Sequence, residues 1–359
     1  MKYAFTNGKI LDGSRDMQVQ TGRCILVKNG KIHDIVSDTT DLSGYTKIDL
    51  KGHYILPGLI NMHVHLAGSG KPQKKQRDNE KLVNTIMSTS LTRAIAYRMV
   101  ADFAKDELLS GVTTIRTVGG LGDFDTRLRD EIKAGTKISP RILASNQGIS
   151  VPGGHMAGSV AVAASSIPDA LSHLKKSEQQ KVDLIKLMIT GGVLDAKEKG
   201  VPGELKMPPE MVRAVCEKAH ADGYLVAAHV ESPEGVRVAL ENGVDSIEHG
   251  AKLTDEMVKL FKERGAFLCT TISPALPYAL FDRSITNATK RSAELTDIDS
   301  ITGSIEKGKA ADLIVTAQNP LKDLKALRNL EMVISGGRFI EHPKIKKRKQ
   351  VEAELDKFL

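Results

Sequence analysis

The sequence predicts an α/β protein in which a (β/α)8 barrel of the TIM type carries a small β-sandwich built from both chain ends. Two features of its 359 residues lead to this prediction. In the middle of the chain, short apolar runs alternate many times with amphipathic segments, which is typical of parallel strands joined by helices. At both ends, short strand patterns are separated by tight turns, which is typical of antiparallel β-structure.

Both chain ends consist of short strand patterns separated by turn signals. Residues 1–57 contain three strand patterns, and an N-G or K-G pair marks a turn in each: YAFTNGKILDG, CILVKNGKIHDIV and TKIDLKGHYILPG. Residues 303–342 show the same style in GSIEKGKAADLIVTAQNP and LEMVISGGRFIEH. We therefore expect these two segments to form one composite sandwich, residues 58–302 to form the barrel, and residues 343–359 to form a basic tail.

The middle of the chain supplies the strand and helix candidates of the barrel. The strand candidates are LINMHVH, GVTTIRTV, RILASN, DLIKLMIT, YLVAAHV, DSIEH and AFLCTTI. The helix candidates cover residues 80–109, 124–134, 168–180, 208–222, 233–242 and 254–264. A doubly wound sheet would show the same alternation. Seven strand candidates, with strand and helix always in the same order, favour a barrel. In such a barrel, catalytic residues lie at the C-terminal ends of the strands.

Composition argues against several classes of function. Hydrophobic residues make up 41% of the chain and charged residues 26%, as in ordinary globular proteins. Aromatic residues make up only 4%, with no Trp, which disfavours stacking platforms for single-stranded nucleic acid. No apolar stretch approaches the roughly 18 residues of a membrane helix, and the N-terminus lacks the apolar core of a signal peptide. We expect a cytoplasmic protein with no membrane partner.

Charge and cysteine content fit the same class. The net charge is +7, and much of the excess lies in KIKKRK, residues 344–349. No recognition motif accompanies this run, so we expect a solvated tail rather than a surface for nucleic acid or anionic lipid. Cys24, Cys216 and Cys269 are widely spaced in apolar runs, which indicates reduced, buried thiols.

The run LPGLINMHVHL places two histidines one residue apart at the end of a strand candidate. Alternate side chains of an extended strand share a face, so His63 and His65 are expected to point the same way. Two neutral imidazoles that converge at a strand end can bind a divalent metal ion such as zinc. A buried strand with two hydrogen-bonded histidines would show the same pattern, so this motif by itself leaves both interpretations open.

Three further strand candidates carry metal-binding or reactive side chains. Lys186 lies inside DLIKLMIT, His229 closes YLVAAHV and His249 closes DSIEHG. Each has an ordinary structural explanation when taken singly. A lysine in an apolar strand is costly, however, unless it is paired or modified. Because four histidines and a lysine occur at matching strand positions, we expect them to converge at one mouth of the barrel.

These stretches resemble the metal-dependent amidohydrolase superfamily. PGLINMHVHL, IKLMITGGV, HVESPEGVRVALENGVDSIEHG and GSIEKGKAADLIV are similar to segments of its imidazolonepropionase-like and Xaa-Pro-dipeptidase-like members, and the likeness covers most of the chain. The resemblance implies that His63 and His65 bind one divalent ion, most simply zinc, and that His229 and His249 bind a second. It also implies that Lys186 is carboxylated by CO2 and bridges the two ions.

The resemblance also implies a reaction. Water held between two such ions would become hydroxide near neutral pH, while one ion would polarise the scissile carbonyl. The expected enzyme is an amidohydrolase, dipeptidase-like or carboxypeptidase-like, that cleaves the C–N amide bond of a dipeptide or an N-acyl amino acid. Members of the family commonly assemble, so we expect a homo-oligomer.

Two other positions carry weaker expectations. His155 lies in the VPGGHM loop after the third strand candidate, and similar Gly-Gly-His loops in the resembling group suggest a contact with substrate. A loop histidine without such a role fits equally well. Arg116 ends the second strand candidate, and the family usually continues there with an aspartate. Thr117 stands in that place, so a local hydrogen bond of the family is expected to be missing.

The main departure concerns the catalytic residue of the family, an aspartate at the end of the eighth strand. The usual G-[TN]-D segment is absent, and TTISPALPYALFDRS runs almost directly into ITNATKRSAEL, which is similar to the last barrel helix. A helix and the eighth strand are therefore expected to be absent between about Phe281 and Thr286. Either a segment is missing from this sequence, or a deletion leaves an open barrel with two unpaired edges. The nearby aspartates replace the missing one poorly: Asp282, Asp297, Asp299 and Asp312.

Several functions therefore stay open from the sequence. A hydrolase of linear amides is the first hypothesis, and a hydrolase of cyclic amides of the imidazolone type is its nearest alternative. The missing aspartate supports a third hypothesis, a catalytically inactive homologue that binds metal or ligand. A basic nucleic-acid binder, based on KIKKRK, has the least support.

Overall fold

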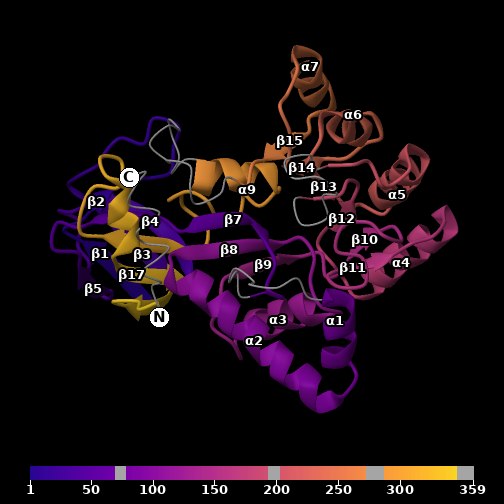
Figure 1. Ribbon diagram of the computed structural model, residues 1–359. Coiled ribbons are helices and arrows are strands. Elements are labelled where there is room, and N and C mark those ends of the chain that lie inside the picture. Colours follow the sequence, from indigo (N-terminus) through magenta and orange to yellow (C-terminus); the bar gives the residue numbers. More distant parts are fainter. Residues whose placement is uncertain (69–77, 193–202, 272–286, 346–359) are drawn as a thin grey trace.

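The computed structural model describes four stretches of the chain: residues 1–68, 78–192, 203–271 and 287–345. Two sheets from the chain ends lie at one end of the molecule, and an α/β part with parallel strands makes up the rest (Figure 1). Two segments discussed above lie outside the described residues. These are the junction near Phe281 and Thr286, which includes Asp282, and the tail from residue 346 onward.

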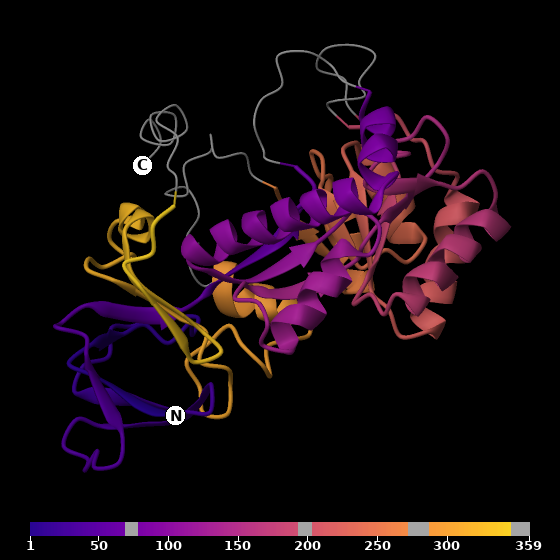
Figure 2. The ribbon, with the colours of Figure 1, turned by 90° about the horizontal axis from the view of Figure 1, so that it is seen from below.

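The chain ends build a four-stranded and a five-stranded sheet. The first has the order β4-β3-β1-β5, with β1 (Lys2–Thr6), β3 (Arg23–Lys28), β4 (Lys31–Ser37) and β5 (Thr46–Asp49). The second has the order β18-β17-β16-β6-β2, with β2 (Lys9–Ile10), β6 (Tyr54–Pro57), β16 (Leu313–Thr316), β17 (Leu330–Ser335) and β18 (Arg338–Glu341). Strand β16 pairs antiparallel with β6, with Leu313 opposite Pro57. Both sheets contribute to one apolar cluster that includes Phe5, Ile25 and Leu313, so the two chain ends meet across a common core (Figure 2).

The rest of the molecule is built on two parallel sheets. The smaller has the order β7-β8-β9, with β7 (Leu59–Val64), β8 (Val112–Thr117) and β9 (Arg141–Ala144). The larger has the order β11-β10-β12-β13-β14-β15, with β10 (Gly148–Ser150), β11 (Ala161–Ala163), β12 (Ile185–Met188), β13 (Val226–Val230), β14 (Ser246–His249) and β15 (Phe267–Cys269). Each of the seven strand candidates contains one of these strands. The three-residue strands β10 and β11 were not predicted from the sequence.

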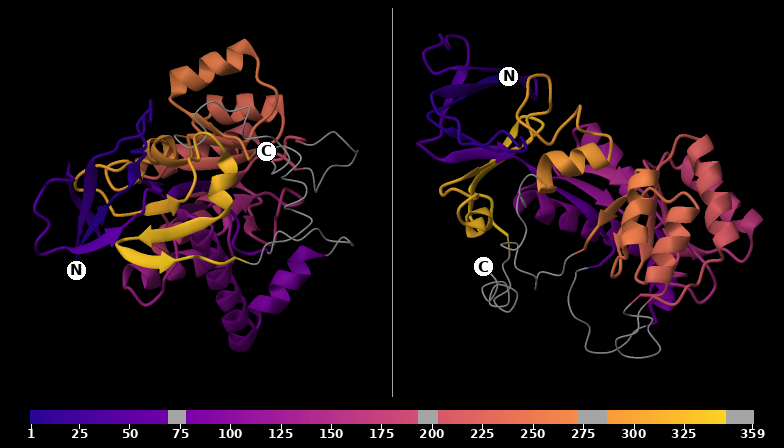
Figure 3. Two further views of the ribbon diagram at one scale, coloured as in Figure 1. Left: turned by 90° about the vertical axis from the view of Figure 1, so that its left-hand side faces the viewer. Right: turned by 90° about the horizontal axis from the view of Figure 1, so that it is seen from above.

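Helices cover the parallel sheets. Their bounds are α1 (Asn79–Met87), α2 (Ser90–Leu109), α3 (Phe124–Lys133), α4 (Ile167–Gln179), α5 (Pro209–Ala221), α6 (Pro233–Glu241), α7 (Asp255–Arg264), the π-helix η3 (Asn287–Arg291), α9 (Ser292–Leu295) and the 3-10 helix η4 (Leu324–Arg328). Apolar residues of α2 and α3 pack on the smaller sheet, and those of α4, α5 and α6 pack on the larger one. In the right-hand view of Figure 3, the pink to orange helices α4 to α7 lie at the far end from the terminal sheets.

Local sequence signals explain where most of these helices begin. The hydroxyl oxygens of Ser166, Ser232 and Thr254 accept hydrogen bonds from the first-turn amides of α4, α6 and α7. The prediction of one helix over residues 80–109 was wrong, because the chain forms two helices there. Thr89 between them has an extended backbone, and its side chain accepts from the amide of Thr92, so it starts a new helix.

The described part of the chain contains neither a membrane-spanning helix nor a disulfide bond. Across the described stretches of chain, none of the helices combines the length and the apolar character that crossing a bilayer requires. Cys24, Cys216 and Cys269 all carry free thiols.

Candidate metal centre

The structure gathers the histidines of different strands at one end of the parallel sheets. His63 and His65 lie at the end of β7, and their ring centroids are 5.0 Å apart. His249 at the end of β14 lies 4.7 Å from His63 and 4.7 Å from His229 of β13, again between ring centroids. Lys186 of the neighbouring strand β12 is buried beside them, with 1% of its surface exposed. The five residues expected from the sequence therefore occupy one site.

The hydrogen bonds of His63 and His65 determine which nitrogens carry protons. Nδ1 of His65 lies 2.9 Å from the carbonyl oxygen of Gly119, and Nδ1 of His63 lies 2.8 Å from a carboxylate oxygen of Glu248. Both partners only accept, so both Nδ1 atoms donate and both Nε2 atoms carry lone pairs. These two Nε2 atoms face each other at 3.2 Å. Two lone pairs at that distance repel each other, unless a cation lies where they converge.

The spacing of these two nitrogens matches a shared metal ion. Two ligands on one tetrahedral zinc ion, each bound at about 2.05 Å, lie about 3.3 Å apart. Burial lowers the pKa of His65 to about 3, and it also lowers the pKa of His63 although Glu248 opposes the shift. Both rings are therefore neutral at pH 7, the form that binds metal ions.

Two buried nitrogens on the neighbouring strands have no hydrogen-bond partner among the described residues. They are Nζ of Lys186 and Nε2 of His229, whose side chains are 1% and 3% exposed overall. An unsatisfied buried polar atom is costly and calls for a bound group. Burial lowers the pKa of Lys186 to about 8, because the charged ammonium is poorly solvated there. Next to β12, Gly148 leaves room for the lysine stem, since a Cβ at that glycine would lie 3.2 Å from Cγ of Lys186.

His249 adopts a backbone conformation that is uncommon for a non-glycine residue. Its φ angle is 70°, in the left-handed region. Its Nδ1 forms a very short contact with the hydroxyl of Thr271, which leaves Nε2 available. Burial lowers the pKa of His249 to about 3. Strained residues persist where the surrounding structure or function requires them, and here the strained residue carries a neutral imidazole at the site.

A buried network beneath the site was missed by the sequence analysis. Glu248 is fully buried and accepts from Arg116 Nη2 at 2.6 Å and from Ser246 Oγ at 2.5 Å, in addition to His63. Arg116 also donates from Nε to the carbonyl oxygen of Met62 at 2.7 Å. Burial by itself would raise the pKa of Glu248, but Arg116 and His63 hold it well below its usual range. An acidic residue inside the apolar strand candidate DSIEH was the signal that could have indicated this network.

His155 and Glu231 also reach the site. The ring of His155 stacks on His229 with centroids 3.9 Å apart and planes 8° from parallel. Gly192 permits this arrangement, since a Cβ there would lie 2.8 Å from Cε1 of His155. Glu231 follows β13, and one of its oxygens lies with ligand nitrogens of His229 and His249 in a group whose members are all within 4.8 Å of one another. The sequence analysis did not single out Glu231, although it stands two residues after His229.

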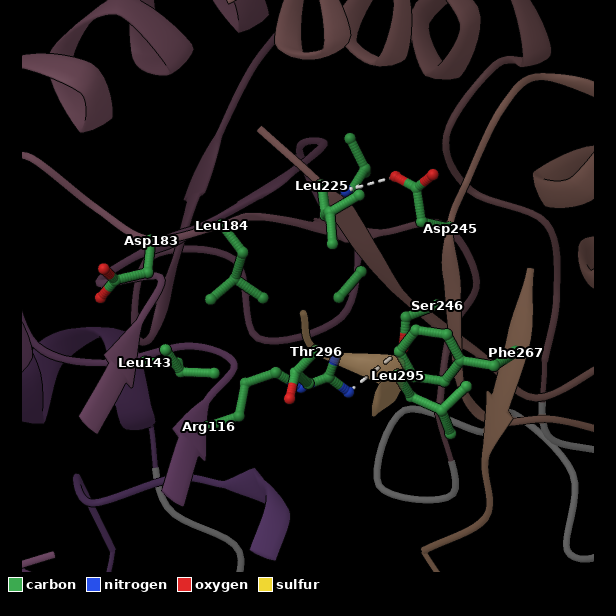
Figure 4. A pocket seen from close by; sticks show the side chains of 12 residues that line it. Arg116, Leu143, Asp183, Leu184, Leu225, Asp245, Ser246, Phe267, Leu295 and Thr296 are labelled. Atoms are coloured by element: carbon green, nitrogen blue, oxygen red, sulfur yellow. Dashed lines mark hydrogen bonds between the residues drawn. The ribbon is translucent and has the colours of Figure 1, made fainter. Parts of the chain in front are cut away.

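A small cavity of about 50 Å³ lies at the opposite ends of the strands, and no histidine lines it. Leu225, Asp245 and Phe267, which stand at or just before the first residues of β13, β14 and β15, line it together with Arg116 (Figure 4). The active sites of parallel barrels form at the C-terminal ends of their strands. We therefore assign the chemistry to the histidine cluster and not to this cavity.

The described aspartates near the chain junction do not reach the histidines. Thr296 lines the cavity at the N-terminal strand ends, and Asp297 directly follows it. Asp312 accepts from Arg141 Nη2 at 3.2 Å and from Thr302 Oγ1 at 3.1 Å, beside the terminal sheets. These contacts leave Asp312 in a structural role.

Comparison with known proteins identifies relatives. Residues 54–284 match the profile of the amidohydrolase family. Ochratoxinase from Aspergillus niger is 23% identical over 276 residues, covering 69% of this chain and 55% of its own length. The chain thus spans little more than half of that relative.

Solved structures match over more of their length. A protein from Bifidobacterium longum, provisionally named a prolidase, is 29% identical with a TM-score of 0.80, covering 99% of this chain and 98% of that one. An Xaa-Pro dipeptidase with methionine bound in its active site is 27% identical with a TM-score of 0.80, covering 95% of this chain and all of that one.

Proposed function

Because this chain belongs to the amidohydrolase family, we propose that it is a metal-dependent hydrolase that cleaves a C–N amide bond of a small molecule. The observation that carries this proposal is the pair of Nε2 atoms of His63 and His65, which face each other at 3.2 Å with both lone pairs directed inward. The unpartnered nitrogens of His229 and Lys186 nearby support a second cation. Buried neutral donors in this arrangement fit divalent metal ions better than an empty pocket.

We propose roles for the residues of the site. His63 and His65 would hold one ion, and His229 and His249 the other. Carboxylation of Lys186 would convert a buried cation into an anionic oxygen donor that reaches both ions, which would remove the cost of its orphaned ammonium. When bound, two divalent ions, most simply zinc, would lower the pKa of a water molecule and polarise the scissile carbonyl. His155, stacked on His229, would contact the substrate at the mouth.

The substrate class is proposed from the relatives. Two of the similar structures carry dipeptidase or prolidase names, and one of them holds an amino acid, methionine, in its active site. Ochratoxinase lies in the same family. These names support a dipeptide or an N-acyl amino acid, and the cyclic amides of imidazolonepropionase are the alternative.

The test is hydrolysis of a panel of dipeptides, including X-Pro dipeptides, and N-acyl amino acids by the purified protein. We expect turnover that disappears after treatment with a chelator and returns when Zn²⁺ or Mn²⁺ is added. His63→Asn should abolish turnover and remove the ion held by His63 and His65, whereas His173→Ala on the outer helix α4 should change neither metal content nor turnover. Turnover that survives complete metal removal would contradict the proposal.

A second candidate function rests on the lack of an aspartate near the histidines among the described residues. Asp297 and Asp312 lie elsewhere, so the protein would bind metal or ligand at the mouth without turning it over. Metal binding by the wild-type protein, combined with no hydrolysis of any substrate in the panel, would favour this second function over the first.

We also propose the complete architecture. The two parallel sheets would belong to one barrel of the (β/α)8 type, residues 58–302, and the two terminal sheets would form one β-sandwich from residues 1–57 and 303–342. The support is the shared apolar core of the terminal sheets, and the buried bond from Arg116 on β8 to Glu248 on β14, which joins the two parallel sheets.

A further inference from the structure

Glu231 lies close to His229 and His249, where its carboxylate can serve as a further protein ligand of the ion proposed there. It directly follows β13, and in extended chain a residue two positions after His229 lies on the same side of the strand. Its backbone amide donates to the hydroxyl of Thr190 at 3.0 Å, and Thr190 is fully buried. This bond ties the start of the loop to the end of β12, so Glu231 is held at the site and does not extend freely into solvent.

The ligand atoms of Glu231, His229 and His249 form one group. One carboxylate oxygen and the two ring nitrogens all lie within 4.8 Å of one another. Ligand atoms on a tetrahedral zinc ion lie about 3.3 Å apart, so shifts of about 1.5 Å or less would bring all three onto one ion. Rotation of side chains is sufficient for shifts of this size.

A second, independent observation points to a bound cation at this group. Nε2 of His229 is buried and has no hydrogen-bond partner among the residues that the structure describes. The ring of His155 stacks on one face of the His229 ring, and this contact fixes the plane of the His229 imidazole. The lone pair of this nitrogen therefore has a fixed direction and accepts no hydrogen bond from the described residues.

We propose that Glu231 is a metal ligand, and that His229, Glu231 and His249 together hold one divalent cation. Two histidines and a glutamate are the donor set of several catalytic zinc sites, in which a fourth position stays open for water or substrate. The carboxylated Lys186 proposed above would add an oxygen donor to this set and to the ion at His63 and His65. The inference rests on the proposed metal dependence, and it adds that three protein donors remain at this ion when Lys186 is removed.

Titration with Co²⁺ tests the assignment, because its visible absorption reports the number and type of ligands. The apoprotein would be titrated as wild type, Glu231→Gln, Lys186→Ala, the double variant, and Glu234→Gln. Glu234 is the matched control, since it is an exposed carboxylate in the first turn of α6, three residues further along the chain. Circular dichroism and thermal unfolding of each apoprotein would establish that it is folded.

We expect Glu231→Gln to weaken one Co²⁺ site by about a hundredfold and to change its spectrum, because a neutral amide replaces a charged oxygen donor. Lys186→Ala should weaken both sites, but the site with Glu231 should keep more of its affinity, because it retains three protein donors whereas the site at His63 and His65 retains two. The double variant should lose both, and Glu234→Gln should match wild type. Glu231→Asp, which keeps the carboxylate, should recover part of the affinity.

Unchanged affinity and spectrum in Glu231→Gln would overturn the assignment. The outcome for the proposed function is read separately, from hydrolysis of the amide panel. If Glu231→Gln loses its site but wild type hydrolyses nothing, the ligand assignment stands and the hydrolase proposal is wrong. If wild type hydrolyses amides and Glu231→Gln binds Co²⁺ normally, the hydrolase proposal stands and the ligand assignment is wrong.

Discussion

Glu248 connects the metal-binding histidines to the interior of the protein. One of its oxygens accepts from Arg116 and Ser246, and the other faces Nδ1 of His63 at 2.8 Å. A buried carboxylate is tolerated only when it is paired and hydrogen-bonded, and this one is. Because the acceptor at Nδ1 fixes the proton there, Glu248 also directs the lone pair of His63 Nε2 toward the site.

Replacing Glu248 with glutamine should therefore affect both stability and metal binding. The guanidinium of Arg116 would stay buried without its counter-ion, which should lower the free energy of unfolding by about 3–5 kcal/mol. The new amide N–H could face Nδ1 of His63 and move the ring proton to Nε2, so metal affinity should fall about 10–100-fold. Urea unfolding and chelator competition measure the two effects.

The control is the surface ion pair between Glu241 and Arg237, 2.8 Å apart on α6. Glu241→Gln removes the same type of charge from an exposed pair and should cost less than about 1 kcal/mol. It should leave metal affinity unchanged. Equal, small effects of both substitutions would mean that the buried network does not position His63.

At the scale of elements, α3 contains a buried carboxylate whose pKa is raised. Asp125 in its first turn is 1% exposed, and neither side-chain oxygen has a hydrogen-bond partner of good geometry among the described residues. A Cβ at Gly120 would lie 2.3 Å from one of these oxygens, so the carboxylate is packed directly against the loop after β8. A helix N-terminus favours negative charge, but burial is the stronger effect and raises the pKa of Asp125 to about 6.

This shift makes a prediction about pH. Between about pH 4 and pH 6 the unfolded chain ionises Asp125 while the folded protein keeps it protonated, so stability falls as pH rises through this window. Asp125→Asn stays neutral throughout. The free energy of unfolding of wild type, relative to Asp125→Asn, should therefore drop by roughly 2.4 kcal/mol from pH 4 to pH 7. Urea unfolding at the two pH values measures this difference.

Asp130 in the same helix gives the comparison, because its side chain is 62% exposed beside Arg129. The stability of Asp130→Asn relative to wild type should change little over the same pH range. If the gap between wild type and Asp125→Asn is constant with pH, or changes in the opposite direction, Asp125 is ionised normally in the folded protein.

At the scale of the whole molecule, the site joins the two parallel sheets. His63 and His65 belong to β7 of the smaller sheet, whereas His229 and His249 belong to β13 and β14 of the larger one. Ions bound at these residues would hold the sheets together, and the unfolded chain would not preserve the arrangement. Binding of this kind stabilises the folded state by mass action.

Metal should therefore raise the stability of the whole protein. With free Zn²⁺ at about 100 times its dissociation constant, we expect the free energy of unfolding to rise by about 2.7 kcal/mol per site. Denaturant unfolding of apoprotein with and without Zn²⁺ measures this, and a chelator should reverse it. The variant with both His63→Asn and His229→Asn should show no increase. A wild-type midpoint that does not respond to Zn²⁺ would show that the metal does not bind at these residues in the folded state.

Patterns within short stretches of sequence were sufficient for the strands and for most of the site. The seven predicted strands of the parallel sheets follow from apolar runs, and five helices begin and end within two residues of the expected positions. His63 and His65 share one side of β7 because side chains alternate along a strand. His229 and His249 lie near the ends of β13 and β14, and Lys186 lies two residues before the end of β12, on strands that run parallel and end on one side of the sheet.

Contacts between distant segments were decided only by the tertiary structure. Glu248 lies 132 residues from Arg116 and 185 from His63, and no local pattern specifies which buried cation a carboxylate will meet. Glu231 becomes a candidate ligand only because β14 places His249 beside His229. The sequence by itself determined which residues each strand offers, because periodicity is a local property. The fold decided which of them meet, because that depends on how the strands of two sheets are brought together.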